Sequence, residues 1–169
     1  MKAQNTKLLY AIVLILFAPG LLAQTAEFEK AQDDNWLVNI NDAYELSKST
    51  NKPILANFTG SDWCGWCKRL RAEVFDTAEF KDWAKENVVL LELDFPRKKQ
   101  LPEEQRAQNQ SLSQFFKVTG FPTVWMFDIQ KNEDNSGFQL APYGKTGYVQ
   151  GGPDRYTSDL EKMIERKNN

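Results

Sequence analysis

Three short, nearly continuous apolar runs constrain the fold of this chain most strongly. They are "ILANFT" over 54–59, "VVLLELDF" over 88–95 and "TVWMFDI" over 123–129. Runs of this length and character are typical of strands that are buried on both faces of a sheet. Helical patterns separate them, and strands that are separated by helices usually pair in parallel. The sequence therefore predicts an α/β fold, in which a mixed central sheet has helices on both faces.

Weaker patterns predict the elements that flank these runs. A helix that begins at Asn41 or Asp42 and continues to about 48 follows from a capping residue and a modest apolar face. The charged, Gln-rich segment over 96–110 is interpreted as a solvated loop and the start of a helix, rather than a binding site. The remaining expectations are a strand over 36–40, helices over about 64–75 and 77–86, a hairpin strand over 138–143, a loop over 144–153 and a final helix with a capping box at 158–161.

The N-terminus has the pattern of a secretory signal. Lys2 and Lys7 precede an apolar run over 8–17, and Leu21-Leu22-Ala23 offers a cleavage site. The run is about ten residues long, which is too short for an ordinary membrane span. We therefore expect a signal peptide over 1–23, a flexible segment over 24–35 and a single domain over 36–169. An uncleaved N-terminal anchor is the alternative.

Composition and charge exclude several kinds of function. Without Lys2 and Lys7, 19 of the 21 basic residues remain against 23 acidic residues, and no basic block stands out. A nucleic-acid partner is therefore not expected. The chain contains no histidine, which removes Cys-His and Ser-His catalysis and histidine metal ligands. We expect a periplasmic or secreted protein with no stable membrane insertion after signal cleavage.

The only two cysteines, Cys64 and Cys67, lie in the stretch "SDWCGWCK". As a structural staple they would close a loop of four residues, which contributes only about 2 kcal/mol in the chain-entropy model. As metal ligands they are too few for tetrahedral zinc, although two thiolates can hold Cu(I). No metal or other cofactor is expected.

A redox role explains the placement of the pair best. Cys64 falls where a buried strand turns into a helix, and the free N–H groups and dipole of a helix N-terminus favour a thiolate. Such sites lower the pKa of a cysteine from about 8.5 toward 7 or below. Cys67 follows one turn later on the packed face, from which it could attack a mixed disulfide. Lys68 and Arg69 either help to hold the thiolate or are ordinary solvated charges.

The motifs around the cysteines resemble those of the thioredoxin superfamily, in particular its small exported bacterial members. They are "NFTGSDWCGWCKRL" over 57–70, "VVLLELD" over 88–94 and "VTGFPTVWMFD" over 118–128. The resemblance covers about residues 36–165. It implies the thioredoxin fold, Cys64 as the nucleophile and Cys67 as the resolving cysteine. It also implies a cis peptide bond between Phe121 and Pro122, which would turn the Phe121 backbone toward a substrate strand.

From this resemblance we expect a thiol–disulfide oxidoreductase that reduces disulfides in exported client proteins. Trp63, Trp66, Phe121 and Pro122 would form an apolar rim that binds the substrate. Electrons would come from a membrane or soluble thiol carrier. The alternatives are a disulfide isomerase or oxidase of the same fold, or a non-catalytic binding module.

The sequence departs from thioredoxin at two places that bear on the chemistry. Gly65-Trp66 replaces the Gly-Pro pair between the cysteines, and the histidine that strong oxidases often carry before the second cysteine is absent. This favours a reductase. Asn57 stands where thioredoxin has a buried aspartate, and an amide cannot take a proton. Glu92, Glu73 or a water molecule could replace that acid.

Overall fold

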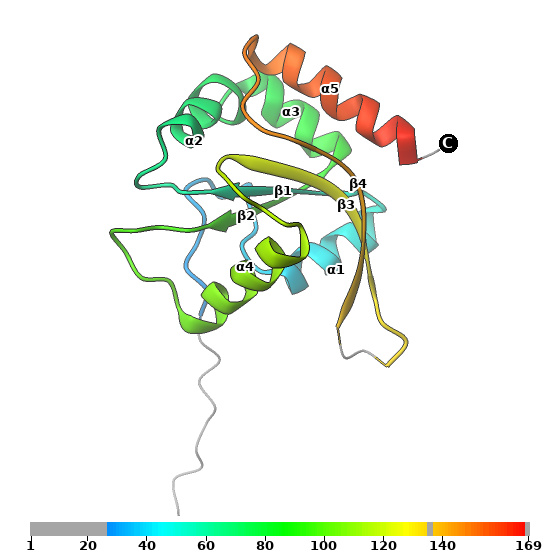
Figure 1. The fold of residues 1–169 in the computed structure, drawn as a ribbon. Coiled ribbons are helices and arrows are strands. Elements are labelled where there is room, and N and C mark those ends of the chain that lie inside the picture. Colours follow the sequence, from blue (N-terminus) through cyan, green and yellow to red (C-terminus); the bar gives the residue numbers. More distant parts are fainter. Residues whose placement is uncertain (1–26, 135–136, 168–169) are drawn as a thin grey trace, which may run out of the picture.

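A mixed sheet of four strands forms the centre of the molecule. The computed structural model describes residues 27–134 and 137–167 (Figure 1). The strands are β1 (Ile54–Thr59), β2 (Val89–Asp94), β3 (Thr123–Lys131) and β4 (Phe138–Thr146). They lie in the order β2-β1-β3-β4. β1 and β2 are parallel, whereas β3 runs antiparallel to both β1 and β4. The predicted α/β thioredoxin fold is confirmed.

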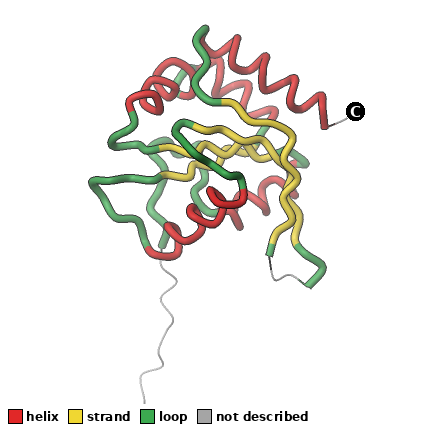
Figure 2. Tube along the Cα trace, viewed as in Figure 1, coloured by secondary structure: helices red, strands yellow, loops and turns green. Residues whose placement is uncertain are grey.

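Helices cover both faces of this sheet (Figures 1 and 2). On one face lie α2 (Gly65–Leu70), its continuation as a π-helix, η1 (Arg71–Phe75), α3 (Ala78–Asn87) and α5 (Gly152–Lys167). On the other lie α1 (Ile40–Thr50) and α4 (Glu103–Phe115). The uninterrupted helical region over 65–75 agrees with the helix expected there. Thr77 caps α3 by accepting a hydrogen bond from the Phe80 backbone N–H at 3.3 Å.

Each face of the sheet has its own hydrophobic core. The core on the α2 face includes Leu55, Leu70, Phe80, Met126 and Leu160. The core on the α1 face includes Ile54, Phe58, Leu91, Leu112 and Phe127. All of these except Leu112 are fully buried, and burying one such side chain contributes about 1.5–3 kcal/mol. β1 and β2 supply side chains to both cores, which explains why their sequences are apolar almost throughout.

The strand predicted over 36–40 is wrong. Only Leu37 pairs with the sheet, through a single parallel bridge to Leu91. The chain turns immediately afterwards, because Asn39 caps α1 by accepting a hydrogen bond from the Asn41 N–H at 2.8 Å. The cap therefore lies two residues before Asn41, the earlier of the two predicted positions, and α1 runs from Ile40 to Thr50.

The loop predicted over 144–153 is also wrong in extent. β4 continues to Thr146, and α5 begins at Gly152 rather than near Ser158. Gly144 lies in the strand because α5 packs closely there: a Cβ at this position would lie 2.7 Å from Cγ and Sδ of Met163. Gly151 and Gly152 have φ values of 127° and 74°, so they make the turn into α5, a conformation that favours glycine.

The predicted signal peptide over 1–23 lies outside the described residues. Residues 27–35 form neither helix nor strand, yet Gln105 holds them to α4. Its side chain accepts from the Glu29 N–H at 2.9 Å and donates to the Glu29 carbonyl at 3.1 Å. Within residues 27–134 and 137–167, no helix has the length and apolar character needed to cross a membrane.

Candidate active site

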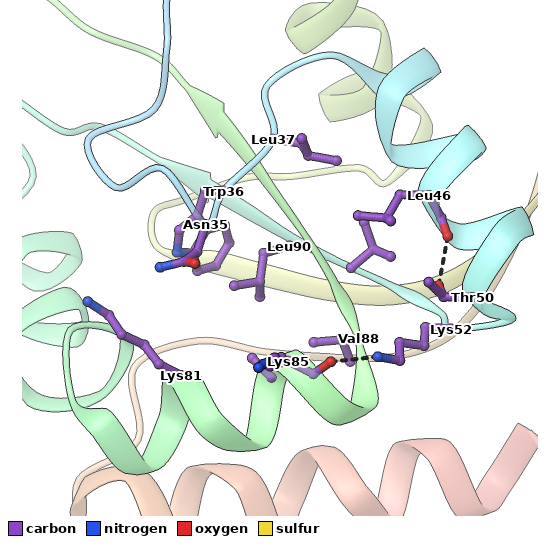
Figure 3. A pocket seen from close by; sticks show the side chains of 12 residues that line it. Asn35, Trp36, Leu37, Leu46, Thr50, Lys52, Lys81, Lys85, Val88 and Leu90 are labelled. Carbon is purple, nitrogen blue, oxygen red and sulfur yellow. Dashed lines mark hydrogen bonds between the residues drawn. The ribbon is translucent and has the colours of Figure 1, made fainter.

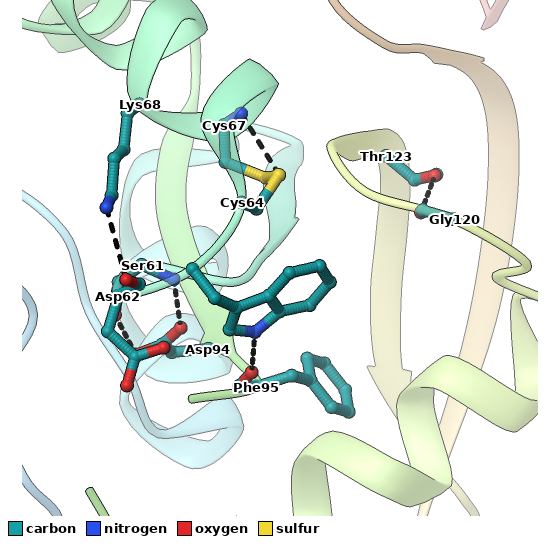
Figure 4. Close-up of a disulfide and its surroundings, with 10 residues drawn as sticks. Ser61, Asp62, Cys64, Cys67, Lys68, Asp94, Phe95, Gly120 and Thr123 are labelled. Atoms are coloured by element: carbon teal, nitrogen blue, oxygen red, sulfur yellow. Dashed lines mark hydrogen bonds between the residues drawn. A yellow bond between two sulfur atoms is a disulfide. The ribbon is translucent and has the colours of Figure 1, made fainter. Parts of the chain in front are cut away.

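Cys64 and Cys67 form a disulfide at the start of α2 (Figure 4). Their Cα atoms are 5.3 Å apart. Cys64 is the N-cap of the helix, and its sulfur accepts a hydrogen bond from the Cys67 backbone N–H at 3.1 Å. This N–H is one of the donors that a helix leaves free at its first turn. Both the hydrogen bond and the positive end of the helix favour negative charge on the Cys64 sulfur.

The turn before the cysteines is fixed to the end of β2. The Cys64 N–H donates to the Gly60 carbonyl at 2.8 Å, which closes the turn. The Ser61 N–H and hydroxyl donate to the two carboxylate oxygens of Asp94, at 2.9 and 2.6 Å. Asp94 is the last residue of β2 and is buried. The position of Cys64 is therefore set by two neighbouring strands and not by the turn alone.

Asp62 ties the same turn to the segment after β2. Its carboxylate accepts hydrogen bonds from the backbone N–H groups of Arg97, at 3.1 Å, and Lys98, at 2.7 Å. Desolvation raises the pKa of Asp62, but these N–H donors outweigh it and hold the pKa below its usual range. Lys68 donates to the Asp62 carbonyl at 3.1 Å (Figure 4). Its ammonium group therefore has a partner in the turn.

Trp63, which directly precedes Cys64, is held in place by contacts with three other residues. Its indole N–H donates to the Phe95 carbonyl at 2.8 Å, and its ring meets Phe121 edge-on at 5.8 Å between centroids. Phe121 in turn contacts the Phe95 ring at 5.1 Å. The guanidinium of Arg97 covers the Trp63 ring at 3.7 Å from its centroid. Trp63 and Phe121 are half-buried members of one aromatic cluster.

The peptide bond between Phe121 and Pro122 is cis, as expected. Gly120 and Thr123, on either side of this pair, belong to the surroundings of the disulfide drawn in Figure 4. The Thr123 hydroxyl donates to the Gly120 carbonyl at 2.8 Å, which closes the bend. Of the predicted rim, Trp63 and Phe121 are therefore in direct contact, and Pro122 follows Phe121 through the cis bond.

Trp66 lies on a separate aromatic shelf, which we define as Trp66, Arg69, Glu73 and Tyr148. Trp66 is 55% exposed, and the centroid of its ring lies 5.1 Å from the centroid of the Tyr148 ring. Arg69 contacts both rings, at 5.6 and 5.2 Å. Glu73 accepts from Arg69 at 2.6 Å and from the Tyr148 hydroxyl at 2.5 Å. Sequence reasoning missed Tyr148, because it comes from the segment between β4 and α5.

The hydrogen bonds of this shelf alter two pKa values. The bond from the Tyr148 hydroxyl, followed by that from Arg69, lowers the pKa of Glu73. The same bond to Glu73 raises the pKa of Tyr148. Glu73 is therefore committed to surface partners, so its carboxylate is a poor replacement for a buried acid behind the cysteines.

A small polar cavity lies behind Cys67. Its volume is about 20 Å³, and Cys67, Asn57, Arg71 and Glu92 are among the residues that line it, whereas Cys64 is not. Asn57 and Glu92 are buried, and they face each other as partners in the parallel pairing of β1 and β2. Arg71 donates to Glu92 at 3.2 Å. The two cysteines thus differ in surroundings, since only Cys67 borders this cavity.

A larger hollow of about 220 Å³ lies elsewhere, between the end of α1, α3 and β2 (Figure 3). Lys52 at its edge donates to the Lys85 carbonyl at 2.5 Å. Neither cysteine nor any residue of the predicted substrate rim lines it. In the described part of the chain, no group of three or more histidine, cysteine or acidic side chains is arranged to hold a metal ion.

Known proteins resemble this chain in sequence and in fold. A family profile described as "Thioredoxin-like domain" matches residues 40–136. The disulfide bond reductase DsbH of Chlamydia pneumoniae is 40% identical over 124 residues, which are 73% of this chain and 69% of that protein. A solved structure of a DsbH oxidoreductase superposes with a TM-score of 0.67 at 33% identity, covering 81% of this chain and 92% of the other.

A thioredoxin from Thermus thermophilus superposes with a TM-score of 0.52 at 12% identity, covering 73% of this chain and 82% of the other. At that identity the likeness concerns the fold alone. The profile match covers more than half of the chain, and the first relative is similar over most of both proteins. The chain belongs to the thioredoxin-like family.

Proposed function

We propose that this thiol–disulfide oxidoreductase acts as a reductase of disulfides in exported proteins. The observation that carries the proposal is the hydrogen bond from the Cys67 N–H to the Cys64 sulfur at the start of α2. It favours a Cys64 thiolate, which is the form that attacks a disulfide. The similarity to a protein named disulfide bond reductase supports the same direction of electron flow.

The proposed reaction has two exchanges. The Cys64 thiolate attacks one sulfur of the client disulfide, so a mixed disulfide forms and the other client sulfur leaves as a thiolate. Cys67 then attacks the Cys64 sulfur, which releases the second client sulfur and forms the Cys64–Cys67 disulfide. The client gains two electrons and the cysteine pair loses two. A thiol carrier, either in the membrane or soluble, would reduce the pair again.

The residues proposed to bind the client lie on two sides of the disulfide. Phe121 and Pro122 would present backbone to an extended client segment, while Trp63 supports them through its contact with Phe121. Trp66, which is more than half exposed, would contact apolar client side chains directly. With a signal peptide over 1–23, the protein would meet these clients in the periplasm or outside the cell.

Trapping tests the proposal. Cys67→Ser leaves Cys64 without its resolving thiol, so mixed disulfides with a disulfide-bonded test protein should accumulate and appear on non-reducing gels. The matched variant Cys64→Ser should accumulate none and should lose reduction of the test protein. If Cys67→Ser traps nothing, the proposal is wrong and a non-catalytic binding role takes its place. If Cys64→Ser still reduces the test protein, Cys64 is not the nucleophile and the proposed reaction is wrong.

A further inference from the structure

We propose that Glu92 accepts the proton that the Cys67 thiol loses before it attacks the mixed disulfide. This inference rests on the dithiol reaction proposed above and assigns a residue to its second exchange. Glu92 acts through a bridging water molecule and does not touch the reacting sulfur atoms. Its role is to accept the proton from this water, so it assists the reaction from outside the group of reacting atoms.

The pairing of β1 and β2 brings this carboxylate to the resolving cysteine. Asn57 and Glu92 are register partners, so their side chains leave the sheet on the same face, and both line the cavity that Cys67 borders. Asn57 itself has only an amide, which cannot accept a proton. The carboxylate next to the resolving thiol is thus supplied by the neighbouring strand.

The cavity is suited to one bridging water molecule. Its volume of about 20 Å³ exceeds the roughly 10–15 Å³ that a water needs. The Asn57 Oδ1 atom is buried and has no hydrogen-bond partner among the described residues. Because buried polar atoms are nearly always satisfied, a water that donates to this oxygen is the expected occupant. The same water can donate its other hydrogen to Glu92 while it accepts from the Cys67 thiol.

The charges around Glu92 keep it able to take a proton. Burial raises the pKa of Glu92, because the ionised carboxylate loses its hydration, and nearby Asp94 adds to this. Arg71 opposes the rise through its ion pair at 3.2 Å, and Lys99 does so more weakly. Lys68 lines the cavity together with Arg71 and Glu92, and these three are its charged residues. A carboxylate with a raised pKa is better matched to a thiol than an ordinary one, so the transfer costs less free energy.

The other carboxylates near the site are already committed. Glu73 is bound on the surface by Arg69 and Tyr148 and does not line the cavity. Asp94 accepts from both the backbone and the hydroxyl of Ser61, and it does not line the cavity either. Of the acidic residues in the described part of the chain, only Glu92 borders the cavity with Cys67.

The second exchange begins with the loss of a proton from Cys67. In the mixed disulfide the Cys67 S–H bond breaks, and the proton passes through the water to the Glu92 carboxylate, which becomes neutral. The Cys67 thiolate then attacks the Cys64 sulfur and forms the S–S bond. The bond between Cys64 and the client sulfur breaks, and its electron pair leaves with the client sulfur. That thiolate takes a proton from solvent, and Glu92 later returns its own proton to solvent.

Ellman's reagent, an aromatic disulfide, separates the two exchanges. Mixed with the reduced protein in a stopped-flow instrument, it should release one coloured thiolate when Cys64 attacks and a second when Cys67 resolves the mixed disulfide. The leaving group needs no proton, so the second phase reports the ionisation of Cys67. Glu92→Gln should leave the first phase unchanged and slow the second on the order of a hundredfold near neutral pH. The two rates should converge as the pH rises above the pKa of the Cys67 thiol, because hydroxide then ionises the thiol without Glu92.

Three further variants and one control separate this role from a structural one. Glu92→Asp should retain part of the rate. Adding Asn57→Asp to Glu92→Gln returns a carboxylate to the same cavity from β1, so the second phase should recover in part. Arg71→Gln removes the ion pair, so Glu92 should hold its proton to higher pH and the second-phase pH profile should shift upward. Glu73→Gln, a matched loss of a surface carboxylate, should change nothing in the second phase.

The outcomes distinguish this inference from the proposed function. A folded Glu92→Gln protein whose second phase equals that of the wild type at every pH overturns the role of Glu92 and leaves the reductase proposal intact. A wild-type protein that shows no second phase overturns the dithiol reaction itself. If Glu92→Gln alone does not fold, the double variant Arg71→Gln/Glu92→Gln, which removes both charges, gives the same test against Arg71→Gln.

Discussion

At the residue scale, the two tryptophans beside Cys64 have different physical roles. The Trp63 indole is fixed by its hydrogen bond to the Phe95 carbonyl and by the Arg97 guanidinium over its ring. Among the residues that the structure describes, the Trp66 indole has no such anchoring hydrogen bond, and 55% of the residue is exposed. We therefore expect Trp63 to hold the site together and Trp66 to contact the client.

Replacing Trp66 tests this difference. Trp66→Ala should lower catalytic efficiency toward a disulfide-bonded protein roughly fivefold, because the lost aromatic contact is worth about 1 kcal/mol. Its rate with Ellman's reagent should stay close to that of the wild type, since a small disulfide makes little use of the shelf. Phe115→Ala is the matched control, because Phe115 is 52% exposed but comes from the end of α4. Equal losses in both variants would contradict a specific role for Trp66.

At the element scale, the turn between β1 and α2 depends on the absence of a side chain at Gly60. A Cβ there would lie 2.5 Å from the Trp63 ring, far inside contact distance. The ring cannot retreat without losing its hydrogen bond to the Phe95 carbonyl. The close approach of this backbone to Trp63 therefore fixes both the turn and the aromatic cluster beside the disulfide.

Gly60→Ala should destabilise the protein by about 1–3 kcal/mol, as is usual when a packed site receives an extra methyl group. Urea unfolding, followed by tryptophan fluorescence, measures the change. Gly120→Ala is the control, because a Cβ at Gly120 would meet nothing within 4 Å. Its free energy of unfolding should change by no more than about 0.5 kcal/mol. A Gly60→Ala protein as stable as Gly120→Ala would show that the Trp63 ring is not fixed as described.

The elements that could be predicted from sequence are those whose local pattern and tertiary environment agree. β1 and β2 are apolar because they are buried along their whole length, and the apolar part of β3 is buried at alternate or adjacent positions from Val124 to Ile129. The helix predicted from about 77 begins directly after its cap at Thr77. The segment over 36–40 has a strand-like sequence, yet only Leu37 reaches the sheet before α1 begins. From the sequence, Gly144 is assigned to a loop because glycine is common in loops. The glycine is needed there because Met163 of α5 packs against the strand, and this contact is not visible in the local sequence.

At the scale of the whole molecule, the buried Glu92 links stability to pH. Its pKa in the folded protein is raised by desolvation above the value in the unfolded chain. The folded state therefore binds the proton more tightly than the unfolded state does. This contribution to stability is fully present below the unfolded pKa of about 4.3, and it is lost as pH rises through the folded pKa.

Glu92→Gln should remove this pH dependence. Relative to the variant, the wild-type protein should become less stable as pH rises from about 4 toward 7, by about 1.4 kcal/mol for each pH unit that separates the two pKa values. Urea unfolding of the oxidised proteins across this range measures the difference. Glu73→Gln should show the opposite sign, because hydrogen bonds from Tyr148 and Arg69 lower the pKa of Glu73. A pH-independent difference between the wild type and Glu92→Gln would contradict the buried, proton-binding state of Glu92.

The candidate site was predictable from sequence only where its parts adjoin in the chain. Cys64, Cys67 and their helix follow from one motif, and the resemblance to the family implied the cis bond before Pro122. Glu92 could be named only as one of several acids, because its place behind Cys67 depends on the register between β1 and β2. Tyr148 gave no signal, since its contact with Trp66 joins segments more than eighty positions apart in sequence.

The reduction potential of the Cys64–Cys67 couple tests the central claim most directly. It can be measured by equilibrating the protein with defined ratios of reduced and oxidised glutathione and following the two thiols. A reductase should have a potential more negative than about −150 mV, toward the roughly −270 mV of thioredoxin. A value above about −150 mV, near the roughly −120 mV of a strong oxidase, would contradict a reductase and assign the protein to disulfide formation instead.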